Sequence, residues 1–136
     1  MVLPDINVLI YAYREGAPEH AAYGDWLAGA VGGYTSFAMS DLVLSGFLRL
    51  VSNPRIFNPV VPLSDALDFT NALRGRPNCV RVVPGPNHWA IFERLCRSAR
   101  AKGNLIPDAY LAALAIEHGC ELITADGDFA RFPGLR

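Results

Sequence analysis

The sequence predicts an α/β fold, a three-layer α/β/α sandwich around a mostly parallel central sheet of four to five strands. Short β-branched segments alternate along the whole chain with longer segments whose apolar residues have helical spacing. Because no repeat, linker or low-complexity tract interrupts this alternation, we expect a parallel sheet with helices on both faces. At 136 residues the chain has the length of one domain, so we expect a single domain over residues 1–136.

The first half of the chain contains two predicted strands and four predicted helices. Pro4 cannot donate to a strand ladder and therefore marks the end of the first strand. Ser40 is a typical N-cap for the third helix, and Ser64 for the fourth. The expected strands are residues 2–4 and 34–37, and the expected helices are residues 7–15, 19–30, 41–51 and 65–73.

The second half adds two strands and two helices. Residues 79–83 and 121–124 are the expected strands, and a helix over residues 86–102 follows the first of them. Gly103 stands where that helix should end, and Pro107 is in a favoured first-turn position of an alanine-rich helix that ends at His118. The residues expected on the buried face of helix 86–102 are Trp89, Phe92, Cys96 and Ala99.

The amino-acid composition restricts the classes of protein to which this chain can belong. A hydrophobic content of 51% fits a compact globular chain, and a net charge of −1 gives no overall electrostatic attraction to nucleic acid. Three widely spaced cysteines without a C-x-x-C motif, and no signal peptide, predict reduced thiols in a cytoplasmic protein. The apolar runs are too short to span a bilayer, so we expect no membrane association.

Five aspartates should converge on one edge of the sheet. Asp5 ends the first strand, Asp41 and Asp108 begin helices, and Asp126 and Asp128 follow the last strand. In a parallel α/β domain the carboxyl ends of strands and the amino ends of helices lie at the same edge. Ligands bind at that edge in open sheets of this kind.

A cluster of carboxylates predicts a cation, because each charge disfavours ionisation of the others. All-oxygen ligation without paired histidine or cysteine favours Mg²⁺ or Mn²⁺ over Zn²⁺. Such an ion can activate water for attack on a phosphodiester. Each aspartate taken alone also fits a structural role, as a helix cap or as part of a turn. Their shared edge is what favours a metal site.

Four segments, in order, resemble the PIN-domain ribonucleases, and in particular the VapC-type toxins of bacterial toxin–antitoxin pairs. The segments are DINVLIYA at 5–12, LSGFLR at 44–49 with NPRIF at 53–57, GNLIPDAYLAALAIEHG at 103–119, and LITADGDFARF at 122–132. Together they cover nearly the whole chain. The resemblance implies an α/β/α fold, Mg²⁺- or Mn²⁺-dependent endoribonuclease activity, inhibition by a small cognate antitoxin, and a homodimer.

The resemblance also implies roles for individual residues. Asp5 and Asp108 would be the chief metal ligands, Asp126 would complete the catalytic set, and Asp128 would be an additional ligand. Asp41 falls where the family usually has a glutamate or aspartate, and is the fourth expected catalytic acid. The residues expected to support the site, by orienting its carboxylates, are Asn7 and Thr124.

Arginines are the candidates for RNA contacts. Arg94, Arg97 and Arg100 recur every three residues on one helix, and two more lie near the middle of the chain. They would hold RNA phosphates beside the acids, or form a solvated surface in which Glu93 pairs with Arg97. The full set is Arg49, Arg55, Arg94, Arg97 and Arg100.

Two other functions stay open at this point. A Mg²⁺-dependent phosphotransfer domain would need a lysine near its acids, and Lys102, the one lysine, lies at the far end of a helix. A phosphatase of that class would also need an acid at position 7, where this chain has Asn7. A catalytically weakened PIN fold that only binds protein or RNA is the second alternative, and Asp41 in place of a glutamate keeps it open.

Overall fold

The computed structural model describes all residues, 1–136, and contains one parallel four-stranded sheet. The strands lie in the order β3-β2-β1-β4, so β3 and β4 are the edges. Val2 is opposite Phe37 on one side and Glu121 on the other. The strand bounds are β1 (Val2–Pro4), β2 (Phe37–Met39), β3 (Cys79–Arg81) and β4 (Glu121–Ile123). The predicted parallel sheet is confirmed, with four strands.

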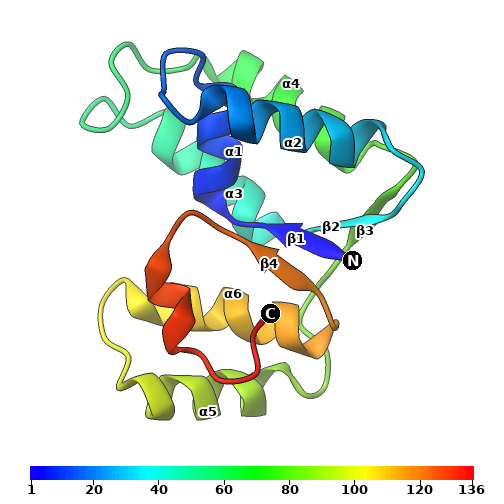
Figure 1. Cartoon of the computed structure of the whole chain (residues 1–136). Helices are drawn as coiled ribbons and strands as arrows, with labels where there is room; N and C mark the ends of the chain where they lie inside the picture. Colours follow the sequence, from blue (N-terminus) through cyan, green and yellow to red (C-terminus); the bar gives the residue numbers. More distant parts are fainter.

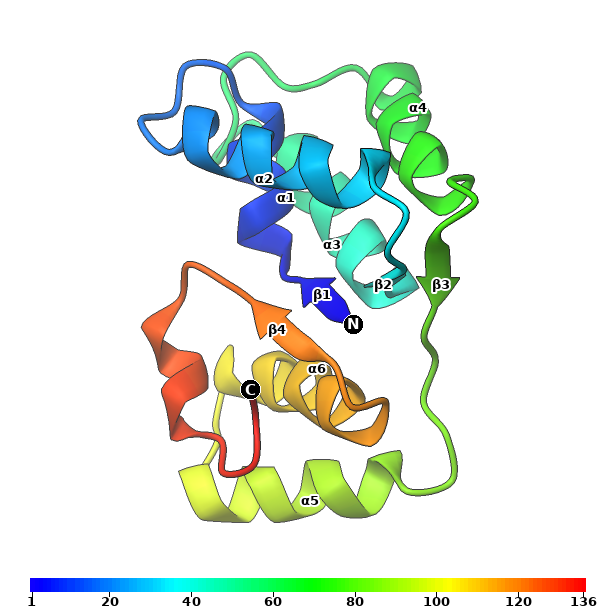
Figure 2. The same ribbon diagram turned by 45° about the vertical axis from the view of Figure 1, so that its right-hand side comes forward.

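Helices cover both faces of this sheet, as predicted. Helices α1 to α4 lie on one side, whereas α5 and α6 lie on the other (Figure 1). Figure 2 shows β3 at the edge, where the chain passes from the first helical layer to α5. The bounds are α1 (Ile6–Tyr13), α2 (His20–Gly32), α3 (Asp41–Val51), α4 (Leu63–Arg74), α5 (His88–Ala99), α6 (Leu105–Glu117) and the 3-10 helix η1 (Gly127–Arg131).

The change of face between crossovers creates a crevice between β1 and β4. The chain leaves β1 through helices of one layer and reaches β4 through helices of the other. The carboxyl ends of these neighbouring strands therefore lie where the two connections diverge to opposite faces of the sheet. Open parallel sheets bind their ligands at this kind of position.

Helix α6 lies directly against the sheet because its inner face is made of small side chains. Ala109, Ala112, Ala113 and Ala115 are all fully buried, as the alanine-rich sequence predicts. At its far end Glu117 accepts hydrogen bonds from the backbone N–H groups of Gly85 (2.7 Å) and Asn87 (2.9 Å), just before α5. These bonds fix α6, and with it Asp108, relative to α5.

The second strand begins later than predicted. It starts at Phe37, whose N–H donates to the carbonyl of Asn78 at 3.0 Å, and not at Tyr34, which is fully exposed. The side-chain amide of Asn78 donates to the carbonyls of Gly33 and Thr35, both at 3.1 Å. The hydrogen bonds of this one side chain hold residues 33–35 in a bend. They outweigh the β propensity of Tyr34 and Thr35.

Two helix boundaries and one buried face also differ from the predictions. Helix α4 begins at Leu63 after Pro62, so Ser64 lies inside the first turn and is not its cap. Helix α5 ends at Ala99 because Arg100 takes a left-handed conformation, with φ of 49°. Trp89 was expected to be buried but is 66% exposed, and its neighbour His88 takes the inner position.

None of the helices has the length and apolar character needed to cross a membrane.

Candidate active site

Asp5 occupies the crevice between β1 and β4. It is the N-cap of α1, and its Oδ1 accepts a hydrogen bond from the N–H of Ile6 at 2.7 Å. Its Oδ2 accepts a hydrogen bond from the hydroxyl of Thr124 at 2.8 Å, and the residue is only 7% exposed. Both carboxylate oxygens are therefore held by donors that come from opposite ends of the chain.

Thr124 and Asn7 connect Asp5 to the segment that follows β4. The Thr124 hydroxyl oxygen accepts from the Asn7 amide at 3.3 Å and from the Asp126 N–H at 3.0 Å. The Asn7 side-chain oxygen accepts from the N–H of Ala125 at 3.1 Å. The structure thus places both residues where they orient Asp5 and the chain that carries Asp126. Their role in catalysis stays a prediction.

Asp108 and the two aspartates after β4 complete a group of four acids with Asp5. Asp108 lies in the first turn of α6, and Asp126 is the N-cap of η1, where its Oδ1 accepts from the Asp128 N–H at 2.9 Å. Burial, together with the charges of the other three acids, raises the pKa of Asp108 to about 6. Burial also raises the pKa of Asp5, against its hydrogen bonds from Thr124 and Ile6 and together with the charge of Asp126. The other three carboxylates therefore lie close enough to disfavour ionisation of Asp108, and Asp126 lies close enough to disfavour that of Asp5.

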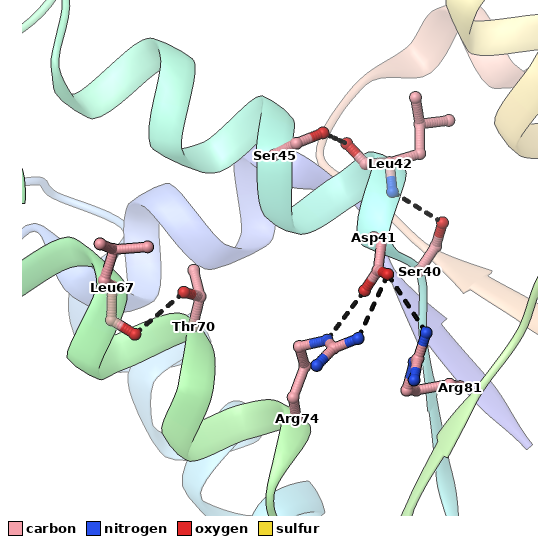
Figure 3. Close-up of polar contacts among 8 residues, drawn as sticks. All are labelled: Ser40, Asp41, Leu42, Ser45, Leu67, Thr70, Arg74 and Arg81. Atoms are coloured by element: carbon pink, nitrogen blue, oxygen red, sulfur yellow. Dashed lines mark hydrogen bonds and ion pairs between the residues drawn. The ribbon is translucent and has the colours of Figure 1, made fainter.

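Asp41 does not join this group. Its carboxylate pairs with Arg74, at 2.9 Å to Nε, and with Arg81, at 3.4 Å, as Figure 3 shows. The hydrogen bond from Arg74 is the main reason that the pKa of Asp41 lies below its usual value. The expectation that all five acids converge is therefore wrong for Asp41, although it lies at the predicted edge.

Helical geometry explains why Asp41 faces elsewhere. Asp5 and Asp108 share a pocket of about 270 Å³, here called the acid pocket, with one stripe of α3. That stripe consists of Leu42, Ser45, Gly46 and Arg49. Asp41 belongs to the adjacent stripe, turned by about 100°, which faces α4 together with Leu44 and Leu48. Successive helical residues point in different directions, so an acid one position before the inner stripe misses the pocket.

The acid pocket also contains residues that are not among the predicted site residues, and Ser45 and Gly46 on α3 are two of them. Their position follows from the spacing i, i+3, i+4, i+7 on α3, once Leu42 is known to face Asp5. The sequence contains that spacing, but nothing in it says which stripe of the helix faces the first strand.

The donors suit a hard divalent cation, although they do not form a closed cage. No three histidine, cysteine, aspartate or glutamate side chains lie close enough to hold one ion in common. The charged groups nearby that could bind a cation are carboxylates, and the pKa of Asp108 is raised by burial and by the charges of Asp5, Asp126 and Asp128. Mg²⁺ and Mn²⁺ accept one or two carboxylates and complete their coordination with water. The residues present therefore fit such an ion.

Comparison with known proteins identifies the family of this chain. Residues 2–135 match the PIN domain family. The chain belongs to the PIN-domain family. This PIN domain is 40% identical over 136 residues to Ribonuclease VapC25 of Mycobacterium tuberculosis, covering 100% of this chain and 96% of that protein. It is also 40% identical to Ribonuclease VapC43 of the same organism, covering 100% of this chain and 92% of that protein.

Solved structures support the same fold. The PIN domain superimposes on VapC20 of Mycobacterium tuberculosis with a TM-score of 0.69 at 17% identity, covering 99% of this chain and 97% of that chain. For VapBC2 of Rickettsia felis the TM-score is 0.70 at 18% identity, covering 99% and 96%. At these identities the likeness concerns the fold, and it confirms the predicted α/β/α architecture.

The arginines predicted to contact RNA have different surroundings in the PIN domain. Arg97 pairs with Glu93 at 2.8 Å, as its i,i+4 spacing predicts. Arg55, Arg94 and Arg100 are exposed, and Arg49 lines the acid pocket. Of the five, Arg49 is the one that shares a pocket with Asp5 and Asp108.

Proposed function

We propose that this PIN domain is a Mg²⁺- or Mn²⁺-dependent endoribonuclease that acts as the toxin of a type II toxin–antitoxin pair. The observation that carries the proposal is the group of four carboxylates at the crevice between β1 and β4. The ribonuclease names of relatives that are 40% identical over the full chain support RNA as the substrate. Action on cellular RNA would place the protein in the cytoplasm, and its three cysteines are free.

The chain's own residues would divide the work as follows. Asp5 and Asp108 would hold the metal directly, and Asp126 and Asp128 would contact it through metal-bound water. When bound, a divalent cation polarises a phosphate oxygen and lowers the pKa of water. Thr124 and the N–H of Ile6 keep the Asp5 carboxylate from rotating, at 2.8 and 2.7 Å. Asn7 holds Thr124 in turn, so the position of Asp5 is set before substrate arrives.

The direct test is cleavage of a labelled structured RNA by purified protein. We expect cleavage with Mg²⁺ or Mn²⁺, no cleavage after EDTA, and recovery when the metal is restored. Intact RNA across a full titration of both metals would contradict the proposal.

A second candidate function is a PIN fold that binds RNA or protein without cutting. It is favoured by the placement of Asp41, because α3 then contributes no carboxylate to the acid pocket. Retained RNA binding together with the absence of metal-dependent cleavage would support this function over the first.

Thr124 should matter for activity although it is not a metal ligand. We expect Thr124→Val to lower the cleavage rate by about 10–100-fold, the usual effect of losing a group that orients a ligand. The change removes the donor to Asp5 and the acceptor for the Asp126 N–H. Thr70→Val is the control for the same change of side chain, because Thr70 is buried and its hydroxyl bonds only to Leu67 within α4. Equal rates for the two variants would argue against the positioning role.

Asp41 should be dispensable for cleavage. We expect Asp41→Asn to cut RNA at a rate close to that of the wild type, because its partners are Arg74 and Arg81 and not the acid pocket. Its ion pairs are exposed, so their loss should also change stability little. Steady-state kinetics of Asp41→Asn and Asp5→Asn, measured in parallel, compare the two acids. If both variants lost activity to the same extent, Asp41 would belong to the active site.

The homodimer is proposed to use an apolar groove beside the acid pocket. This groove, of about 430 Å³, is lined largely by apolar side chains, among them Val83, Phe92, Ile106 and Tyr110. The exposed Trp89 packs on Phe92 at 5.2 Å between ring centroids. A projecting ring and a groove on one surface suit a two-fold contact in which the Trp89 ring of each copy fills the groove of the other.

We expect Trp89→Ala to convert a dimer into a monomer in size-exclusion chromatography with light scattering. Tyr34→Ala is the control, since Tyr34 is fully exposed but lies outside the groove.

The antitoxin is a separate part of the proposal. If a short antitoxin-like reading frame lies immediately upstream, co-expression of its product should give a stable complex that no longer cuts RNA.

A further inference from the structure

Arg49 is a cation without a partner inside an acidic pocket. It lies in the last turn of α3 and lines the acid pocket with Asp5 and Asp108. Its guanidinium takes part in none of the ion pairs of the structure and in none of its side-chain hydrogen bonds. Arginine near carboxylates usually pairs with them, so a free one here is available to another anion.

The other arginines near this edge are already engaged. Arg74 and Arg81 are both held by Asp41 on the neighbouring stripe of α3. Among the cationic residues of the chain, Arg49 is the one that lines the acid pocket. A favourable interaction with the helix dipole would explain a cation in the last turn, but it would not explain why this turn borders the acids.

Gly46 lets the side chain of Ile6 pack directly against α3 in the wall of the acid pocket. A Cβ atom at this position would clash with Cδ1 of Ile6, which lines the same pocket. The glycine therefore allows α1 and α3 to approach each other at the pocket that Arg49 also lines.

We propose that Arg49 binds the phosphate group of RNA at the bond to be cut, an inference that rests on the proposed nuclease function. The carboxylates of Asp5 and Asp108 repel a phosphodiester, and a positive charge that lines the same pocket offsets this repulsion. A guanidinium can donate two parallel hydrogen bonds to the non-bridging oxygens, which fixes the orientation of the phosphate as well as its position. Arg49 is thus the phosphate-binding residue of this site.

The test measures RNA binding without metal, so that it does not depend on cleavage. Fluorescence anisotropy of a short labelled RNA hairpin, in EDTA and at several salt concentrations, compares the wild type with Arg49→Gln. We expect Arg49→Gln to bind about 10-fold more weakly and to lower the slope of log affinity against log salt by about 1, the value for one lost phosphate contact. Arg49→Lys keeps the charge and should retain most of the slope.

Arg76→Gln is the matched control for loss of one exposed positive charge. Arg76 lies outside the acid pocket, and its Nε donates only to the carbonyl of Val31. We expect its salt slope to equal that of the wild type. Thermal melts of all variants show whether each is folded.

In single-turnover cleavage, Arg49→Gln should slow the reaction and Arg49→Lys should restore part of the rate. An unchanged salt slope for Arg49→Gln, or no RNA binding by the wild type, would overturn the inference. If the wild type binds RNA and loses one phosphate contact with Arg49→Gln but never cuts, the nuclease proposal fails while the phosphate contact stands.

Discussion

Replacing Asp5 with asparagine is expected to remove RNA cleavage and to leave the fold intact. We expect the rate to fall by more than about 100-fold, because residues that only orient a ligand already account for about 10–100-fold. The asparagine would still cap α1 through its side-chain oxygen, so the hydrogen bond from the Ile6 N–H survives. What disappears is one full negative charge at the crevice between β1 and β4.

Stability measurements separate this loss of activity from loss of structure. Burial raises the pKa of Asp5, which means that the fold carries a cost for its charge. The neutral Asp5→Asn should therefore be at least as stable as the wild type in urea denaturation at pH 7. Asp25→Asn is the control for losing an acid, since Asp25 is exposed on α2. Cleavage by Asp5→Asn at the rate of Asp25→Asn would remove Asp5 from the mechanism.

The edge at which the acids gather could be predicted from the sequence because strand ends and helix starts share it. Asp5, Asp108, Asp126 and Asp128 follow this rule directly, since each lies at or next to the end of an element. The rule places a residue at an edge but does not say which way its side chain points. For Asp108 the burial of the alanine face of α6 settles the direction, and for Asp5 the cap geometry does.

Asp41 and Trp89 show where such reasoning ends. Each is one helical position away from the residue that has the predicted place: Leu42 lines the acid pocket, and His88 is buried. A rotation of about 100° per residue is enough to place Asp41 in an ion pair and not in the pocket, and Trp89 in solvent and not in the core. The spacing of apolar residues alone does not show which face of either helix is buried. Helix α3 is packed on two sides, and α5 mixes aromatic and charged residues.

The start of β2 depended on an interaction far apart in the sequence. Asn78 holds the turn at Gly33 and Thr35 from a position more than 40 residues away. Local propensity cannot contain that information, so Tyr34 and Thr35 look like strand residues although they are not.

Neutralising Asp108 is expected to stabilise the protein while it removes activity. Its carboxyl has a pKa of about 6 in the folded protein and 3.8 as the ordinary value. Below a pH of about 3.8 both states are protonated, so the group has no effect on the free energy of unfolding. As pH rises toward 6, the unfolded chain loses its proton first, and stability decreases. Above that pH the full cost is present.

The size of this cost follows from the shift in pKa. Two pKa units correspond to about 3 kcal/mol, and solvent screening of a half-buried group lowers this to roughly 1–2 kcal/mol. We therefore expect Asp108→Asn to raise the free energy of unfolding at pH 7 by that amount in urea denaturation. The gain should shrink as the pH is lowered toward 4. Mg²⁺ should stabilise the wild type and have less effect on the variant, because the variant lacks one ligand.

The sign of the change in the free energy of unfolding for Asp108→Asn distinguishes a metal ligand from an ordinary acid at the start of a helix. An aspartate in a first helical turn normally stabilises its helix by about 0.3–1 kcal/mol, so neutralising it should destabilise the protein. Asp65 in the first turn of α4 is such a residue, and Asp65→Asn should be slightly less stable than the wild type. Asp108 has the same favourable position in α6, but three other acids surround it. If Asp108→Asn behaved like Asp65→Asn, the carboxylates would not be close enough to share a cation. If it is more stable and inactive, the fold bears a cost at Asp108 that only a bound cation offsets.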